Sequence, residues 1–235
     1  MEAISRKDFT ESQIELIQKT IDESGMEKEN KREMKLLAHI GQYTGQRLVD
    51  GVFLKSAEIH LDKNVIILMP DKTRKFLTKV TIPIHPDFRK ILLEADLTQE
   101  YVLPKFAERY MHNPDAIKNM FLNILLQAKI SSVVKRDRGI DRDEYGYHSY
   151  RHTFASKMAS AGVPVAVLAA MLGDTIRTAE KYYINISDEA KMNAIKTLTT
   201  AKPKTEPKEE LDKLSKALKS LSKKKQAELL KLLQA

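Results

Sequence analysis

The chain has 235 residues, a formal net charge of +8 and no cysteine. This length allows one domain of ordinary size, with or without an appendage, that buries a substantial core. Without cysteine, disulfide scaffolds, thiolate zinc sites and cysteine nucleophiles are excluded.

The termini and the charge distribution indicate where the protein acts. No apolar run reaches the roughly 18–20 residues that a membrane span needs. The N-terminus, MEAISRKDFTESQ, lacks the apolar stretch of a signal peptide. We therefore expect a soluble cytoplasmic protein with no membrane partner. Residues 201–235 hold ten lysines and five acids, so they supply +5 of the +8 charge, and the body is only mildly basic.

The first half of the sequence predicts helices followed by a small sheet. Thr10 and Gln13 form a capping-box pattern at the start of the first helix. The polar run GMEKENKRE separates this helix from the next. The predicted helices span residues 11–24 and 34–43, with a short one from Arg47. The segments EIHLDKNVIILMP and KFLTKVTIPI are rich in β-branched residues, which predicts antiparallel strands joined by a turn at 70–74.

The second half predicts mainly helix. Helices are expected over residues 88–95, 102–111, 116–134, 149–161, 164–172 and 177–183, with a charged break, KRDRGIDRDEYG, before His148. The segment AKPKTEPK has two prolines and no apolar residue besides alanine, which is typical of a linker. We expect a mainly α fold with a small antiparallel sheet (α+β). Its divisions are a domain over 1–200, a linker over 201–207 and a basic amphipathic helical tail over 208–235.

Two histidines, His148 and His152, lie four residues apart, which is the spacing of zinc ligands in HExxH helices. Here Ser149 replaces the general-base glutamate, and Arg151 would place a fixed cation beside the metal. The pattern therefore argues against a metal site. Taken alone, these residues also suit a helix N-terminus with polar capping groups.

The order of the motifs resembles the tyrosine recombinases, the family of phage integrases, Xer recombinases and Cre. The resemblance lies in HSYRHTFA, a Gly-Val-Pro turn, an apolar helix ending in Leu172-Gly173, and a tyrosine about ten residues later. Upstream, YTGQR, ending at Arg47, is similar to the family's first arginine box, and Lys72 lies in the predicted turn that carries the family's lysine. The resemblance covers about residues 34–186 and implies the family's catalytic-domain fold.

The resemblance implies strand cleavage by a tyrosine hydroxyl, with no metal and no cofactor. Arg47 and Arg151 would bind the non-bridging phosphate oxygens through planar, permanently charged guanidinium groups. Lys72 would protonate the leaving 5′ oxygen, and His148 would assist proton transfer or donate a hydrogen bond to the phosphate. The tyrosine becomes joined to the 3′ phosphate. Taken singly, Arg47 could cap a helix and Lys72 could be an ordinary turn lysine; the ordered set favours catalysis.

Two adjacent tyrosines are candidates for the nucleophile. Successive helical side chains point about 100° apart, so only one of them can face the phosphate. The family usually places the nucleophile two residues before a histidine or similar polar residue, and Tyr183-Ile184-Asn185 fits that spacing. We predict that Tyr183 is the nucleophile and that Tyr182 is a packing residue. His152 is expected to support Arg151.

Asp174 departs from the family pattern, because the usual Leu-Gly-His is here Leu172-Gly173-Asp174. A carboxylate against the scissile phosphate would repel it. We therefore expect Asp174 not to touch the phosphate but to cap the following helix, since aspartate favours N-caps. A hydrogen bond from His148 or Arg151 is the other way to neutralise this acid.

The resulting functional hypothesis is a site-specific recombinase or integrase of a mobile element, acting as a dimer or tetramer on double-stranded attachment sites. The high charge content without cysteine or tryptophan is compatible with an archaeal source. The alternatives are a type IB topoisomerase and a non-cleaving DNA-binding protein. Most family members carry an N-terminal DNA-clamping domain, and only residues 1–33 precede the match. The sequence is thus either a piece of a longer integrase or an enzyme that uses the catalytic domain alone. The tail is expected to dock on a neighbouring protomer or to bind DNA.

Overall fold

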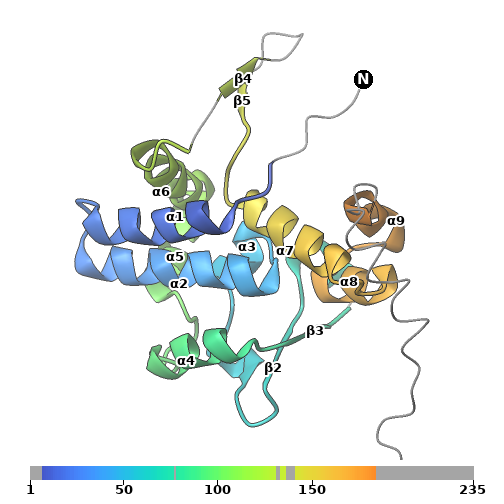
Figure 1. Ribbon diagram of the computed structural model, residues 1–235. Helices are drawn as coiled ribbons and strands as arrows, with labels where there is room; N and C mark the ends of the chain where they lie inside the picture. Colours follow the sequence, from blue (N-terminus) through green and yellow to red (C-terminus); the bar gives the residue numbers. More distant parts are fainter. Residues whose placement is uncertain (1–6, 77, 131–132, 136–140, 184–235) are drawn as a thin grey trace, which may run out of the picture. The chain divides into compact units, whose positions relative to one another are not determined.

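The computed structural model describes residues 7–183 except 77, 131–132 and 136–140 (Figure 1), and gives only the backbone of residues 74–76, 133–135, 141–143 and 183. The predicted linker and tail, 201–235, lie outside the described residues. The α-helices are α1 (Glu11–Glu23), α2 (Lys28–Thr44), α3 (Leu48–Val52), α4 (Pro86–Glu94), α5 (Pro104–His112), α6 (Pro114–Gln127), α7 (His148–Ser160), α8 (Val165–Leu172) and α9 (Ile176–Ala179). The strands are β1 (Ile59–His60), β2 (Val65–Leu68), β3 (Val80–Pro83), β4 (Val133–Lys135) and β5 (Asp141–Asp143). The 3-10 helices are η1 (Ser56–Glu58), η2 (Asp71–Phe76) and η3 (Glu180–Tyr183).

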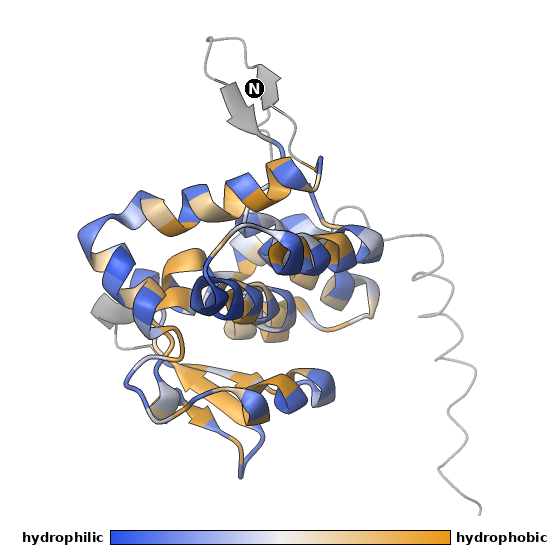
Figure 2. Cartoon of the chain, turned by 90° about the vertical axis from the view of Figure 1, so that its left-hand side faces the viewer, coloured by the Kyte–Doolittle hydropathy of each residue, from blue (hydrophilic) through white to orange (hydrophobic). Residues whose placement is uncertain are grey.

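The predicted fold class is confirmed, because the described residues are mostly helical with one small three-stranded sheet. Its strand order is β1-β2-β3, and both pairs are antiparallel. Figure 2 shows these strands as mostly apolar, whereas the helices carry polar and apolar residues on different sides. Ile66 pairs with Ile82 and Leu68 pairs with Val80, and all four side chains are buried. None of the described helices has the length and apolar character to cross a membrane.

The start of the chain folds as its local pattern predicts. The Thr10 side chain accepts a hydrogen bond from the backbone N–H of Gln13 at 3.2 Å, and the Gln13 side chain accepts one from the backbone N–H of Thr10 at 2.9 Å. This reciprocal capping box starts α1 at Glu11. Ile14, Ile17 and Ile21 then bury one face of the helix.

Helix α2 begins at Lys28, six residues before the predicted start, so most of the polar run GMEKENKRE is helical. The reason is a buried acid. Glu33 is 1% exposed, and its carboxylate accepts hydrogen bonds from the backbone N–H groups of Lys105 and Phe106 at 3.0 and 2.7 Å. A polar residue is thus buried because it satisfies the free N–H groups at the start of α5.

The predicted helix over 116–134 is wrong at its C-terminal end. Helix α6 stops at Gln127, and Lys129 adopts a left-handed conformation with φ of 56°. The residues that follow form β4, which pairs antiparallel with β5. In Figure 1 this hairpin extends away from the helices. The β-branched valines of β4 suit a strand better than a helix.

Helix α7 crosses α2 at close range, which fixes the position of the motif that begins at His148. A Cβ atom on Gly41 would lie 2.9 Å from Tyr150 Cδ2, so only glycine fits at this crossing. The Tyr147 hydroxyl donates a hydrogen bond to the Leu37 carbonyl oxygen at 3.0 Å. Tyr150 is fully buried. The next residue of α7, Arg151, is therefore held against the C-terminal end of α2.

Candidate functional site

Arg151 is a fully buried cation whose hydrogen bonds join three segments. Its side chain is 1% exposed. The guanidinium donates from Nη1 to the Gly45 carbonyl oxygen at 3.0 Å and from Nη2 to the Leu172 carbonyl oxygen at 2.8 Å. Nη2 also contacts Asp174 Oδ2 at 2.5 Å. A buried charge needs such partners, because removing it from water is otherwise costly. These hydrogen bonds therefore fix the orientation of the Arg151 guanidinium group.

Arg47 lies immediately before α3, at the end of a turn that only glycine permits. Gly45 has a φ of 63°, and a Cβ atom there would lie 2.7 Å from Phe154 Cδ1. This left-handed residue ends α2 and redirects the chain. The Arg47 side chain is 20% exposed, and its Nη2 donates to Asp174 Oδ1 at 2.7 Å. The sequence-predicted arginines therefore converge on one carboxylate.

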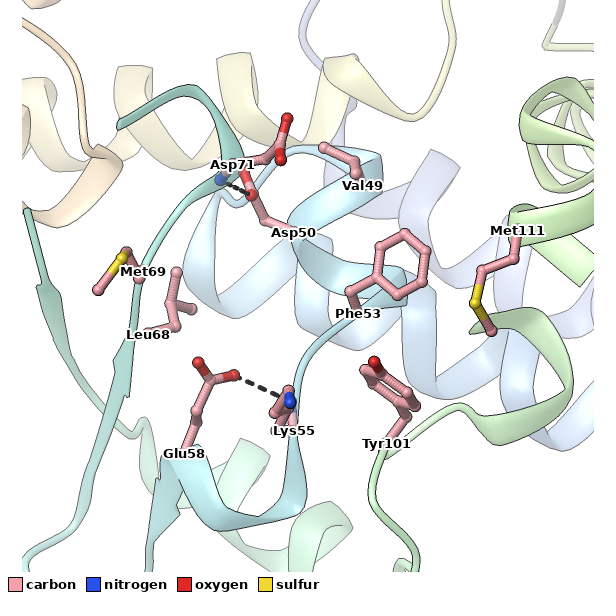
Figure 3. Close-up of a pocket in the computed structure, with 10 residues that line it drawn as sticks. All are labelled: Val49, Asp50, Phe53, Lys55, Glu58, Leu68, Met69, Asp71, Tyr101 and Met111. Atoms are coloured by element: carbon pink, nitrogen blue, oxygen red, sulfur yellow. Dashed lines mark hydrogen bonds between the residues drawn. The ribbon is translucent and has the colours of Figure 1, made fainter. Parts of the chain in front are cut away.

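Lys72 reaches the same carboxylate from η2, the segment between β2 and β3. Its Nζ lies 3.3 Å from Asp174 Oδ1, and its side chain is 59% exposed. Next to it, the backbone N–H of Asp71 donates to Asp50 Oδ1 at 2.7 Å (Figure 3). The Asp50 carboxylate also lies 3.8 Å from Arg47 Nη1. Asp50 therefore joins the segment that carries Arg47 to the segment that carries Lys72.

The Asp50 carboxylate lies at the edge of a pocket of about 390 Å³. In Figure 3 the pocket is otherwise surrounded mostly by apolar and aromatic side chains, among them Phe53, Leu68 and Tyr101. Burial raises the pKa of Asp50, and the hydrogen bond from Asp71 together with the charge of Arg47 opposes the rise. Arg47, Lys72 and Arg151 are not among the residues that line this pocket, so the pocket is distinct from the point where the three cations meet.

Asp174 does not cap a helix, so that expectation is wrong. The N-cap of α9 is Thr175, whose side chain accepts a hydrogen bond from the backbone N–H of Thr178 at 3.2 Å. Asp174 instead accepts a hydrogen bond from Arg151, which was the other way expected to neutralise this acid. Its side chain is only 4% exposed. Burial raises its pKa, but the charges of Arg151, Arg47 and Lys72 outweigh burial and lower it, so the carboxylate is ionised.

His148 lies at the N-terminus of α7, one turn before the second histidine. Burial, followed by the influence of the neighbouring His152, Arg151 and Lys181, lowers the pKa of His148. At pH 7 the imidazole is neutral and can accept a proton. His152 is 6% exposed, and its ring centroid lies 5.1 Å from that of His148.

Of the two tyrosines, Tyr182 is the one whose side chain is described, and it faces the site. Its ring centroid lies 5.4 Å from that of His152, and the residue is 9% exposed. Burial raises the pKa of Tyr182, while the charge of Arg151 and a hydrogen bond with it lower that pKa. The ring also belongs to the buried apolar cluster that includes Phe154 and Leu168. The backbone of Tyr183 ends η3, and its side chain lies outside the described part of the chain.

Two residues near the site were not expected from the sequence: Asp50 and Lys181. Lys181 lies 4.9 Å above the Tyr182 ring, and the charge of Asp174 acts on it. No local pattern marks Asp50, although its position three residues after Arg47 places it one helical turn away.

The arrangement suits one anion held by several cations beside a hydroxyl and a neutral imidazole. Guanidinium groups bind phosphate and carboxylate in the same planar geometry. Among the described residues, no group of three or more histidine or acidic side chains is arranged to hold a metal ion. The chemistry that these side chains themselves can supply is charge stabilisation, proton transfer and attack by a hydroxyl.

Comparisons with known proteins concern the family and the fold. The model of the phage integrase family matches residues 7–190, and so includes α1, which the sequence resemblance left out. No curated protein matches the chain. The catalytic domain of bacteriophage HP1 integrase is 20% identical with a TM-score of 0.58, over 86% of this chain and 100% of that domain. XerA recombinase is 18% identical with a TM-score of 0.55, over 87% of this chain.

A third structure, the Tn1549 transposon integrase in complex with transposon right end DNA, is 14% identical with a TM-score of 0.57, over 85% of this chain and 68% of that one. At these identities the similarity concerns the fold. The matched region spans 66% of the XerA chain and 52% of a XerH recombinase chain. The chain therefore corresponds to only part of those proteins.

Proposed function

Because the chain belongs to the phage integrase family, we propose that it cleaves and rejoins double-stranded DNA at specific sites through a 3′-phosphotyrosine intermediate. One observation carries the proposal. Arg47, Lys72 and Arg151 come from three separate segments, and all three reach the same carboxylate at 3.3 Å or less. Cations from distant segments that meet at one point form an anion site, and a scissile phosphate is the anion that the family's chemistry requires.

The proposed reaction uses each of these groups once. A tyrosine Oη attacks the phosphorus and forms a P–O bond, while the bond from phosphorus to the 5′ oxygen breaks. The tyrosine proton passes to the neutral imidazole of His148, directly or through water, and Lys72 gives a proton to the leaving 5′ oxygen. The two arginines stabilise the charge that develops on the non-bridging oxygens. Rejoining is the reverse, with a 5′ hydroxyl as the nucleophile.

The nucleophile is one of the two adjacent tyrosines. The spacing to Asn185 predicts Tyr183. Tyr182 is held in the buried apolar cluster with Phe154 and Leu168, which suits a packing residue. We propose Tyr183 as the nucleophile, which must come within reach of the phosphorus that it attacks.

The partners follow from the same proposal. The substrates are double-stranded attachment sites, and the protein acts as a dimer or tetramer on them in the cytoplasm. The Tn1549 integrase that shares the fold is seen with DNA, which supports a DNA partner here. The basic tail over 208–235 would either bind DNA or dock on a neighbouring protomer.

The test is a covalent trap. A nicked duplex that carries the element's own attachment site is incubated with the protein, so that the released strand end diffuses away and rejoining is blocked. The proposal expects a protein–DNA adduct that survives denaturation, with the 3′ phosphate on a tyrosine. A shuffled duplex of the same length is the control.

Two rivals remain, and the same assay separates them. A type IB topoisomerase would form the adduct on the shuffled duplex as well and would relax a supercoiled plasmid without the site. A non-cleaving DNA-binding protein would bind the duplex and form no adduct. The position of Asp174 in the anion site is the observation that favours this second rival.

A further inference from the structure

We propose that Asp174 is an internal competitor for the DNA phosphate. In the DNA-free protein its carboxylate occupies the anion position formed by Arg47, Lys72 and Arg151, and the phosphate must displace it before cleavage. The identity of the displacing phosphate rests on the proposed function. The competition itself is a property of the free protein and can be measured without cleavage.

The two oxygens of the Asp174 carboxylate contact different cations. Oδ2 contacts Arg151 at 2.5 Å, and Oδ1 accepts a hydrogen bond from Arg47 at 2.7 Å and lies 3.3 Å from Lys72. With 4% exposure, the side chain is enclosed by these partners. A carboxylate and a phosphate present oxygens to a guanidinium in the same way. The carboxylate therefore takes up the donors that a phosphate would use.

Both anions cannot be bound there together. A phosphate diester and an ionised carboxylate in contact repel each other, most strongly where water is excluded. If the phosphate binds to Arg47 and Arg151, the Asp174 side chain has to turn out of the site. Displacement by a phosphate therefore means loss of three ionic contacts by Asp174.

Turning the side chain out does not disrupt the neighbouring helices. Helix α9 is capped by Thr175 and not by Asp174. Helix α8 ends at Gly173, whose φ is 62°, and the backbone N–H of Asp174 donates to the Ala169 carbonyl oxygen at 3.0 Å. None of these contacts uses the Asp174 side chain. Within the described residues, the hydrogen bonds and ion pairs of the carboxylate are those to the three cations, so it can leave them while the local fold stays intact.

The competition has a functional consequence. A small free anion gains only its contacts with the cations, and so it displaces Asp174 poorly. A phosphate within a bound duplex is held in place by the rest of the DNA, which raises its effective concentration at the site. The carboxylate would therefore keep the cations unavailable to stray anions and release them to a phosphate on correctly docked DNA.

The test measures binding of inorganic phosphate by the full-length protein, by calorimetry and by the shift in melting temperature. Asp174→Asn keeps the size of the side chain and removes the charge. We expect this variant to bind phosphate at least about tenfold more tightly than the unaltered protein, because the binding-competent fraction is no longer limited by the carboxylate. The gain should disappear in the double variant Asp174→Asn, Arg47→Ala, which shows that the phosphate occupies this site.

Asp22→Asn is the matched control, because it removes an exposed carboxylate that pairs with Lys35 at 2.9 Å. It should bind phosphate as the unaltered protein does. Equal phosphate affinity in the unaltered protein and the Asp174→Asn variant would overturn the proposal. If the Asn variant does not fold, Asp174→Ser repeats the measurement with a smaller neutral side chain.

The covalent-trap assay distinguishes the proposal that Asp174 competes with phosphate from the proposal that the protein cleaves DNA. A gain in phosphate affinity without any adduct supports the competition and contradicts strand cleavage. Adduct formation without a gain supports cleavage and overturns the competition.

Discussion

The carboxylate of Asp50 accepts a hydrogen bond from the backbone N–H of Asp71 at 2.7 Å and thereby ties the start of α3 to η2. Asp50 is 8% exposed. This hydrogen bond helps to set the distance between Arg47 and Lys72. Asp50 itself has no proposed contact with the phosphate or the leaving group. Asp50 is a positioning residue in this arrangement.

We expect Asp50→Ala to slow cleavage by on the order of tenfold, because it removes the hydrogen bond that positions Asp71 and, next to it, Lys72. Asp50→Asn keeps an acceptor oxygen and should recover most of the rate. Single-turnover cleavage at saturating DNA measures this effect, and DNA affinity should change little. The control is Asp62→Ala, an exposed acid in the β1–β2 turn. Equal rates for the Ala and Asn variants would contradict the positioning role.

The two tyrosines are separated by a pair of conservative changes. Tyr183→Phe should abolish the covalent adduct and leave DNA binding within about a factor of a few, since only the attacking oxygen is lost. Tyr182→Phe should still form the adduct. Fragmentation of the adducted peptide in a mass spectrometer identifies the modified residue. The opposite pattern would assign the attack to Tyr182.

The paired arginines predict the ionic requirements of cleavage. Arg47→Ala should slow cleavage by on the order of 10²-fold or more, as expected when a preorganised charge is lost from the transition state. Arg47→Lys keeps the charge but not the planar pair of donors. Its cleavage rate should therefore lie between those of the unaltered protein and the Arg47→Ala variant. Cleavage should continue in excess EDTA. A strict need for an added divalent ion would disprove this mechanism.

The tail is tested through the salt dependence of DNA binding. Each phosphate contact by a lysine releases counterions and steepens the fall of affinity with salt. If the tail binds DNA, deletion of residues 204–235 should weaken binding and reduce this slope. If it docks on a neighbour, cleavage should persist while strand exchange fails. Unchanged binding, cleavage and strand exchange would show that the tail is dispensable.

Gly45 offers a stability test with two matched controls. Gly45→Ala places a Cβ atom 2.7 Å from Phe154 on a backbone with positive φ. The cost of the left-handed conformation is roughly 1–2 kcal/mol, and overpacking adds about 1–3 kcal/mol.

Gly162 also has a positive φ, of 78°, but a Cβ atom there would meet nothing within 4 Å, so Gly162→Ala should show the conformational cost alone. Gly25 has neither feature, and Gly25→Ala should change the free energy of unfolding by no more than about 0.5 kcal/mol. Denaturant unfolding measures all three. Equal losses at Gly45 and Gly162 would mean that the contact with Phe154 relaxes freely.

Local patterns predicted what depends on local physics. The capping box of Thr10 and Gln13 and the strands rich in β-branched residues are each determined by residues a few positions apart. The order of the motifs likewise identified Arg47, Lys72 and Arg151 as a set. Local patterns did not predict the start of α2, because the burial of Glu33 depends on backbone N–H groups in α5.

The sequence alone therefore determined which side chains can supply the chemistry, and the tertiary structure decided how they combine. Asp174 lies 127 residues from Arg47 and 102 from Lys72 along the chain. Its local sequence offered a helix cap, but Thr175 fills that role, and the buried charge of Arg151 needs a partner. A buried guanidinium attracts the nearest carboxylate more strongly than free backbone N–H groups do, and only the packing of α2, α7 and α8 made Asp174 that carboxylate.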